Sequence, residues 1–254
     1  MTSTQKQSGL GLSVATILAI IGTLLVNSLS NFFPPGGQNV GEIANTVLQG
    51  VMITPANYAF AIWGVIYIGL ISYGVYQFRQ RQNPDIRRAN LCLITACVIQ
   101  MVWIYLFTLQ MFWLSVVAML GILGSLIRAY IVLGIGEFSV PKRYLWSVHI
   151  PFSIYTAWIS VATVVNVASA LYANGWSGLG LGGVAWTVML LLVAGAIATL
   201  VILQRGDGAF GLVFVWAYVA IVVRQQSVPA IWVTAVAIAV GLALLWAYKK
   251  LSFR

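Results

Sequence analysis

Residues 55–67, Pro-Ala-Asn-Tyr-Ala-Phe-Ala-Ile-Trp-Gly-Val-Ile-Tyr, carry the side chains with the clearest potential for ligand chemistry. Their spacing predicts that Phe60, Trp63 and Tyr67 lie on one side of a helix, because steps of three and four residues align side chains. Aromatic rings on a close-packed helix can line a flat pocket and stack on a flat ligand. The same stripe also fits ordinary helix packing.

Two further aromatic stripes recur at helical spacing, each accompanied by a neutral polar residue. Such polar groups must find hydrogen-bond partners when their segment lies in lipid. Most Trp residues of membrane proteins sit at the interface, whereas Trp63, Trp103 and Trp158 fall deeper in their segments. The further candidates for ligand binding are Gln100, Trp103, Phe107, Tyr155, Trp158 and Asn166.

The sequence offers little for catalysis. All four acidic residues fall in predicted loops, so no acid or base lies at mid-membrane depth, which argues against a proton-coupled pump. His149 is the lone histidine: it fits an interfacial residue, or an axial ligand for haem iron. We predict no catalytic residue, no metal site and no obligatory cofactor.

Composition identifies the solvent of this chain as lipid. Hydrophobic residues make up 61% of the 254 residues and charged residues only 7%, against about 25% charged in a soluble domain. We therefore predict an all-α, polytopic membrane bundle of about eight helices. The predicted spans are 9–30, 57–77, 89–108, 111–134, 145–171, 183–203, 209–223 and 229–248.

The basic residues predict the orientation of the chain. With eight spans, every Lys and Arg falls on one side of the membrane except Arg224, so the positive-inside rule places both termini in the cytoplasm. The net charge of +9 is spread over helix ends and short loops. It therefore argues for membrane orientation and against a nucleic-acid surface.

The uncharged, Gly-rich linker 172–182 is the predicted seam between two domains, a five-helix domain (1–171) and a three-helix extension (172–254). Gly64, Gly69 and Gly74 permit close helix approach. They fit a homodimer face and packing within one chain equally well.

Three stretches resemble the TspO/MBR family, the tryptophan-rich sensory proteins. Pro34-Pro35 followed by Phe60-x-Ile62-Trp63-x-x-Ile66-Tyr67 is similar to the family's PP loop and its F-x-P-V-W-x-x-L-Y run. Gln100-x-x-Trp103-x-x-x-Phe107 resembles N-x-x-W-S-P-L-F, with Gln for Asn and without the proline. Tyr155-x-x-Trp158 with Asn166 looks like the family's fifth helix.

The resemblance covers about residues 9–171. The residues after 171 resemble the tail of the longer bacterial members of the family. The resemblance implies a five-helix core with a pocket open toward the polar loop 31–54, whose Pro34 and Pro35 would act as a lid. It also implies porphyrin or haem as a ligand and the bacterial inner (plasma) membrane as the location.

The leading hypothesis is therefore a tetrapyrrole-binding sensor or regulatory receptor that is not an enzyme. Three alternatives stay open at this point. They are a transporter of a hydrophobic metabolite or porphyrin, a protein that degrades porphyrin in light, and an assembly subunit of a larger membrane complex.

Overall fold

The computed structural model describes residues 3–176 and 178–252, and all their regular structure is helical. Arg254 and the side chain of Lys6, both used in the orientation argument, lie outside what is described. The chain forms two compact units. Unit 1 comprises Met1–Asn39 and Ile62–Thr156, and unit 2 comprises Val40–Ala61 and Ala157–Arg254. These units are defined by packing, so the predicted domain boundary between residues 171 and 172 stays a prediction.

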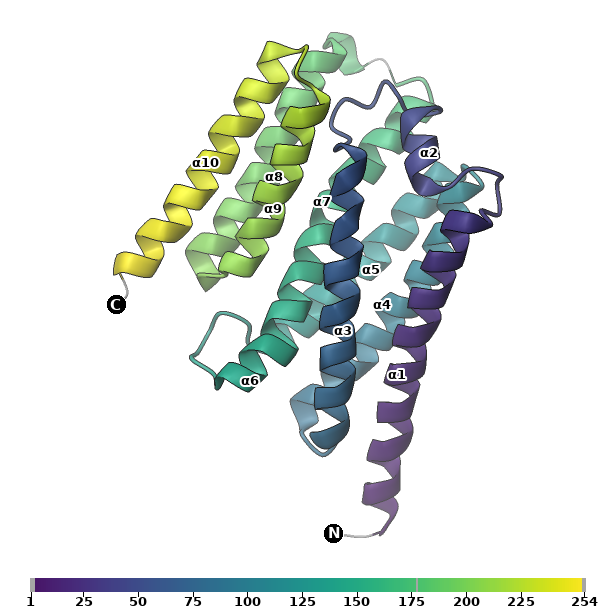
Figure 1. Ribbon diagram of the computed structural model, residues 1–254, viewed down its shortest axis with the longest axis vertical. Helices are drawn as coiled ribbons and strands as arrows, with labels where there is room; N and C mark the ends of the chain where they lie inside the picture. The colour runs from purple at the N-terminus through teal and green to yellow at the C-terminus, as the bar shows by residue number, and fades with distance from the viewer. Residues whose placement is uncertain (1–2, 177, 253–254) are drawn as a thin grey trace. The chain divides into compact units, whose positions relative to one another are not determined.

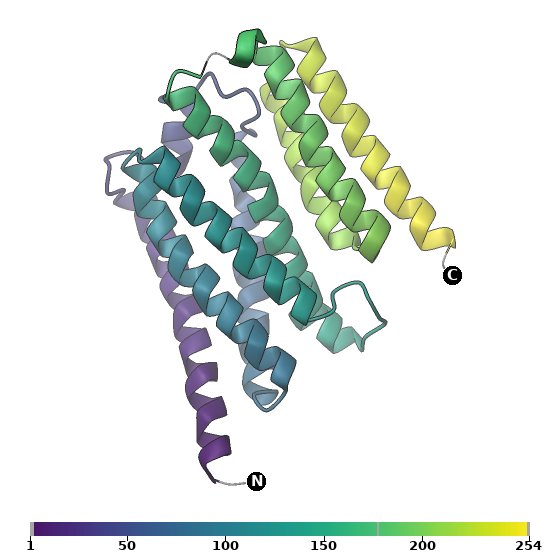
Figure 2. The same cartoon turned by 180° about the vertical axis from the view of Figure 1, so that it is seen from behind.

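Unit 1 is a helical bundle built around α4 (Figures 1 and 2). α4 packs most extensively against α5 and also against α1, while α3 packs against α1. The elements of unit 1 are α1 (Ser3–Phe32), α3 (Ile62–Arg79), α4 (Pro84–Thr108), α5 (Phe112–Val132), α6 (Lys142–Tyr144), the π-helical segment η2 (Leu145–His149) and the first residues of α7 (Ile150–Ala173).

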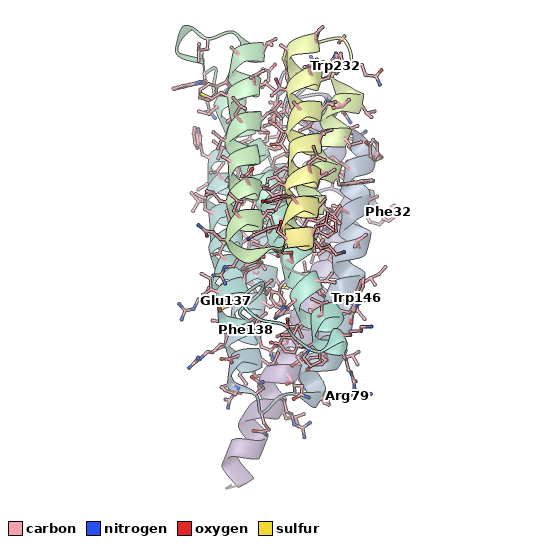
Figure 3. The ribbon with its side chains drawn as sticks, turned by 90° about the vertical axis from the view of Figure 1, so that its left-hand side faces the viewer. Phe32, Arg79, Glu137, Phe138, Trp146 and Trp232 are labelled. Atoms are coloured by element: carbon pink, nitrogen blue, oxygen red, sulfur yellow. The ribbon has the colours of Figure 1, made fainter. Side chains whose placement is uncertain are left out.

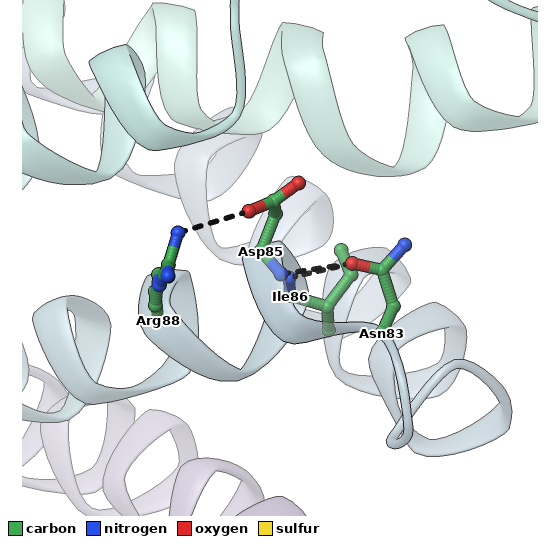
Figure 4. Close-up of polar contacts among 4 residues, drawn as sticks. All are labelled: Asn83, Asp85, Ile86 and Arg88. Atoms are coloured by element: carbon green, nitrogen blue, oxygen red, sulfur yellow. Dashed lines mark hydrogen bonds and ion pairs between the residues drawn. The ribbon is translucent and has the colours of Figure 1, made fainter.

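Local chemistry sets the ends of α4 (Figure 4). Asn83 caps its start, because the Asn83 Oδ1 accepts hydrogen bonds from the backbone N–H groups of Asp85 (2.9 Å) and Ile86 (3.3 Å). Pro84 occupies the first turn, where its missing N–H costs nothing. At the other end only residues 109–111 separate α4 from α5, so the two helices are antiparallel neighbours.

The helix that precedes α7 is distorted next to a proline. The N–H of Ile150 donates to the carbonyl of Leu145, five residues back, which makes η2 a π-helical turn. Pro151 has no N–H and its ring crowds the preceding turn, which is a sufficient physical reason for this register change. The resulting bend lies directly before the turns that carry Tyr155.

Unit 2 contains the three C-terminal helices, which lie side by side in both ribbon views (Figures 1 and 2). Its described elements are α2 (Val40–Asn45), η1 (Asn57–Ala61), the remainder of α7, η3 (Gly178–Gly180), α8 (Gly183–Arg205), α9 (Gly208–Arg224) and α10 (Pro229–Ser252). Gly206 ends α8 in the left-handed conformation (φ 63°), and Asp207 then caps α9 through the N–H of Phe210. Lys249 of α10 donates to the carbonyl of Ile202 at the end of α8 (3.1 Å), which ties these two helices together.

The described residues form a multi-pass membrane protein, as the sequence predicts. Seven helical stretches are long and apolar enough to cross a bilayer, and α9 is an eighth apolar helix of 17 residues. Large apolar side chains such as Leu18 (62% exposed) and Ile68 (72% exposed) cover the outside of unit 1, and Phe32 points away from the helices (Figure 3). Surfaces of this kind are stable against lipid.

The three glycines of α3 differ in their surroundings. A Cβ on Gly69 would lie 3.1 Å from the ring of Pro151, so Gly69 serves packing of α3 against α7 within the chain. A Cβ on Gly74 would make ordinary contact with Ile20, and a Cβ on Gly64 would meet nothing within 4 Å. A homodimer face on α3 therefore stays a prediction for Gly64 only.

Candidate ligand site

Three of the predicted aromatic residues are in ring contact inside unit 1. On α3, Trp63 and Tyr67 are one helical turn apart and stack, with ring centroids 5.6 Å apart and planes 25° from parallel. Tyr155, from the start of α7, meets Trp63 edge-on at 6.0 Å. Trp63 and Tyr67 are partly exposed and Tyr155 is fully buried, so the group runs from the surface of the unit into its interior.

Among the described residues of unit 1, the side chains of Gln100 and Tyr155 are buried without a hydrogen-bond partner. Both the amide oxygen and the amide nitrogen of Gln100 are orphaned, and so is the hydroxyl of Tyr155, although both residues are 0% exposed. An unpaired buried polar group costs about 1–3 kcal/mol, so this arrangement calls for a partner.

The hydroxyl of Ser13 on α1 is also buried without a partner, but its position is less telling. A serine hydroxyl in a helix can rotate onto the carbonyl of the preceding turn. Tyr155 cannot do this, because its hydroxyl stands at the far end of a rigid ring. The extended amide of Gln100 likewise offers four hydrogen-bonding positions that one local carbonyl cannot fill.

A second aromatic group follows along α4. Trp103 and Phe107 stack at 5.1 Å, and Phe107 meets Phe112 edge-on at 5.4 Å. Both Trp103 and Phe107 are buried, at 8% and 5% exposure. Trp103 and Phe107 lie between Gln100 and the end of α4.

The two prolines predicted to form a lid lie in a tight turn against that same end. The N–H of Gly37 donates to the carbonyl of Pro34 (3.0 Å), which closes a turn over Pro35 and Gly36. Gly36 rests directly on α4: a Cβ at this position would lie 1.9 Å from the carbonyl oxygen of Thr108. Only glycine fits this approach, so the turn has a fixed place on unit 1.

The remaining predicted site residues belong to unit 2. Phe60 meets Trp158 edge-on at 6.2 Å, and both Trp158 and Asn166 are buried in α7. Phe60 lies in the 3-10 turn η1, before α3 begins at Ile62, so it does not continue the α-helical face of Trp63 and Tyr67. A single site formed by all nine predicted residues stays a prediction.

His149 has a structural environment. Its Nε2 donates to the carbonyl oxygen of Leu133 at the end of α5 (3.1 Å), and its ring meets Tyr144 edge-on. Ligation of haem iron through Nε2 would require this bond to break. Among the described residues, no three His, Cys, Asp or Glu side chains come together in a group that could hold a metal ion.

Sequence reasoning missed Asn27 of α1, whose side-chain amide donates to the hydroxyl of Tyr67. A polar residue in an otherwise apolar span is the signal that could have identified it. Asn27 fixes the orientation of the Tyr67 ring, and with it the face that stacks on Trp63.

Unit 2 also contains a small hollow between α7, α8 and α9. Its volume is about 10 Å³, and its wall is almost entirely carbon, with Ile53, Val161, Leu191 and Phe214 among the lining residues. This is about the space of one water molecule, and it offers no polar partner for one. The hollow is too small for a macrocycle, so the aromatic and polar groups of unit 1 are the better candidate site.

Comparison with protein families gives one match, to a family described as TSPO-like protein, over residues 13–248. The match covers nearly the whole chain and includes α8, α9 and α10, which the sequence resemblance had left outside the core. Comparisons with curated proteins and with solved structures gave no match.

Proposed function

We propose that this chain, which belongs to the TSPO-like protein family, is a membrane receptor that binds a tetrapyrrole such as a porphyrin or haem. It acts as a sensor or regulator. The candidate binding residues in unit 1 are Trp63, Tyr67, Gln100 and Tyr155, with Trp103 and Phe107 extending the aromatic lining. The proposed location is the bacterial inner membrane, with both termini in the cytoplasm.

The observation that carries this proposal is the unmet hydrogen-bonding capacity of Gln100 and Tyr155. A ligand that pairs with these groups removes a cost that the unliganded protein already bears, about 1–3 kcal/mol for each group. The Gln100 amide can donate and accept, and the Tyr155 hydroxyl can do the same. The pyrrole nitrogens and side-chain carboxylates of a porphyrin offer both kinds of partner.

The aromatic rings beside these groups favour a flat ligand. Trp63 and Tyr67 are nearly parallel, and Tyr155 stands edge-on to Trp63. Offset stacking and edge-to-face contacts each contribute about 0.5–1.5 kcal/mol beyond buried area. A macrocycle can use both modes at once, whereas an acyl chain can use neither.

Titration of the purified protein with protoporphyrin IX tests the proposal. We expect saturable quenching of Trp fluorescence, and at least roughly tenfold weaker binding in Trp63→Ala, because the ring contacts and buried area of Trp63 are lost. Trp113→Ala is the matched control, since Trp113 is 49% exposed on α5. Absence of saturable quenching, or equal loss of affinity in the two variants, would refute the proposal.

The same preparation separates binding from the alternative functions. Uptake of protoporphyrin into proteoliposomes would indicate a transporter, and binding without uptake a receptor. Product formation in light but not in darkness would indicate porphyrin degradation.

A further inference from the structure

The segment 40–61, here called the first loop, begins with the short helix α2 and ends with the 3-10 turn η1. Between α2 and η1 its residues 46–56 form turns, and short backbone bonds such as Val51 N–H to Leu48 O (3.0 Å) shape them. A stretch such as 46–56, which has neither helix nor strand, is usually mobile unless other elements hold it. In unit 2 it is held by α9.

Arg224, the last residue of α9, makes three of these attachments. Its guanidinium donates to the carbonyl oxygen of Ala44 (3.1 Å), to Asn45 Oδ1 (2.8 Å) and to the carbonyl oxygen of Pro55 (3.5 Å). One side chain therefore joins the end of α2 to a point ten residues further along the loop. Asn45 continues the connection, because its amide nitrogen donates to Asn57 Oδ1 (2.9 Å).

Gln225, directly after α9, and two residues within the helix attach the middle and the end of the loop. Gln225 donates to the carbonyl oxygen of Met52 (2.8 Å), and the N–H of Ala56 donates to the carbonyl oxygen of Ala220 (3.1 Å). The indole of Trp216 donates to the carbonyl oxygen of Ala59 (3.1 Å), and its ring meets Tyr58 edge-on at 5.2 Å. The attachments thus continue to the residue before Phe60.

α9 is itself fixed by its neighbours. Tyr218 donates to the carbonyl oxygen of Leu191 on α8 (2.6 Å). α10 packs on both α8 and α9, and a Cβ on Gly195 of α8 would lie 2.8 Å from Ile238 of α10. The three C-terminal helices therefore form a rigid support for the end of α9 that carries Arg224.

We infer that α9 is a latch for the first loop and that Arg224 is its principal positioning residue. Within unit 2, the latch sets the place of Phe60 against Trp158. Its bearing on ligand binding rests on the proposed function, whereas its hold on the loop does not. This gives the C-terminal helices a role: they position the segment through which the chain enters the aromatic part of α3.

Arg224 suits this role because of its shape. A guanidinium presents five donors in a rigid fork and can bridge several oxygens, whereas the ammonium of lysine is a point charge. Hydrogen bonds made by charged groups contribute more than neutral ones. Loss of the guanidinium should therefore raise the population of the unlatched loop roughly 10- to 100-fold.

Hydrogen exchange of the full-length protein in nanodiscs tests the latch without any ligand. In Arg224→Gln we expect amide exchange across residues 44–59 to accelerate roughly 10- to 100-fold, with α8 and α10 unchanged. Arg224→Lys should fall between this variant and the wild type. Arg79→Gln removes the same charge from an exposed position at the end of α3 and should leave the loop unchanged.

Two results would overturn the latch: unchanged exchange of the loop in Arg224→Gln, or equal acceleration throughout α8, α9 and α10. The second would mean that Arg224 only stabilises unit 2 as a whole. Protoporphyrin titration of the same samples separates this inference from the proposed function. Faster loop exchange combined with weaker porphyrin binding supports both, and faster loop exchange in a protein that binds no porphyrin supports the latch alone.

Discussion

Two groups of buried polar residues in unit 1 share helix α4 and differ in one respect. Tyr73 and Gln77 of α3 and Asn90 of α4 pair completely: the Tyr73 hydroxyl donates to Asn90 Oδ1 (2.6 Å), and the Asn90 amide donates to Gln77 Oε1 (2.9 Å). The Gln77 amide then donates to the carbonyl oxygen of Ser13 on α1 (3.1 Å). Further along α4, Gln100 remains unpaired, and so does Tyr155 of α7.

This contrast distinguishes polar groups that hold helices together from polar groups that await a partner. All three members of the paired group are 0% exposed, and so are Gln100 and Tyr155, so burial alone does not separate them. Pairing does. A complete set of hydrogen bonds makes the first group part of the packing of α1, α3 and α4, and the orphaned set makes the second group a candidate binding site.

Asn90→Leu should have the largest effect on stability. It leaves Gln77 Oε1 buried without a partner and leaves the Tyr73 hydroxyl only its long bond to the carbonyl oxygen of Ile86 (3.5 Å), so the free energy of unfolding should fall by about 1–3 kcal/mol. Single interhelical bonds in membranes average only about 0.6 kcal/mol, but this change removes two such bonds at once. Thermal unfolding in detergent measures the loss.

Leu91→Ala is the control for Asn90→Leu, because Leu91 is the next residue on α4 and is 57% exposed toward lipid. Its unfolding temperature should stay close to that of the wild type. Equal stability of Asn90→Leu and wild type would mean that the paired group contributes nothing to packing, and the contrast between the two groups would fail.

Gln100→Leu should act in the opposite direction on stability and strongly on binding. Replacement of an unpaired buried amide by an apolar side chain of similar size removes a desolvation cost, so stability should hold or rise by about 1 kcal/mol. Affinity for protoporphyrin should fall about tenfold, because the ligand loses a hydrogen bond. Gln77→Leu, the same change in the paired group, should lower stability instead.

Parallel measurements of unfolding and of porphyrin binding decide this prediction. If Gln100→Leu destabilises the protein as much as Gln77→Leu, then Gln100 has a structural partner and carries no argument for a ligand. If it leaves affinity unchanged, the ligand does not reach α4 at that turn.

The sequence predicted the fold well, because membrane spans depend on length, apolarity and basic helix ends. The predicted spans 89–108 and 111–134 left only a short connection between them, which is a local signal. Phe60 was harder, since spacing alone placed it on a helix with Trp63, whereas the backbone there forms a 3-10 turn. The change of helix type depends on how the first loop is held, and that information comes from α9, more than 150 residues away.

The site could be predicted only in part for a similar reason. Composition identified Gln100 as a polar residue in an apolar span, but it could not reveal that Gln100 lacks a partner while Asn90 has two. Pairing depends on how the faces of α1, α3 and α4 meet. Arg224 is the same case: as an isolated charge it was an exception to the orientation rule, and its role depends on three oxygens of a loop distant in sequence.

Tyr155→Phe is the smallest change and isolates one hydroxyl. The ring keeps its edge-on contact with Trp63, so binding of protoporphyrin should weaken only severalfold, consistent with one neutral hydrogen bond of about 0.5–1.5 kcal/mol. Stability should not fall, because the hydroxyl has no partner to lose.

Tyr73→Phe is the matched control: it removes the 2.6 Å bond to Asn90 and should lower the free energy of unfolding by about 1 kcal/mol. Two identical substitutions on tyrosines with 0% exposure should therefore divide their effects, one on ligand and one on fold. Loss of stability in both variants would show that Tyr155 is packed like Tyr73 and would remove it from the site.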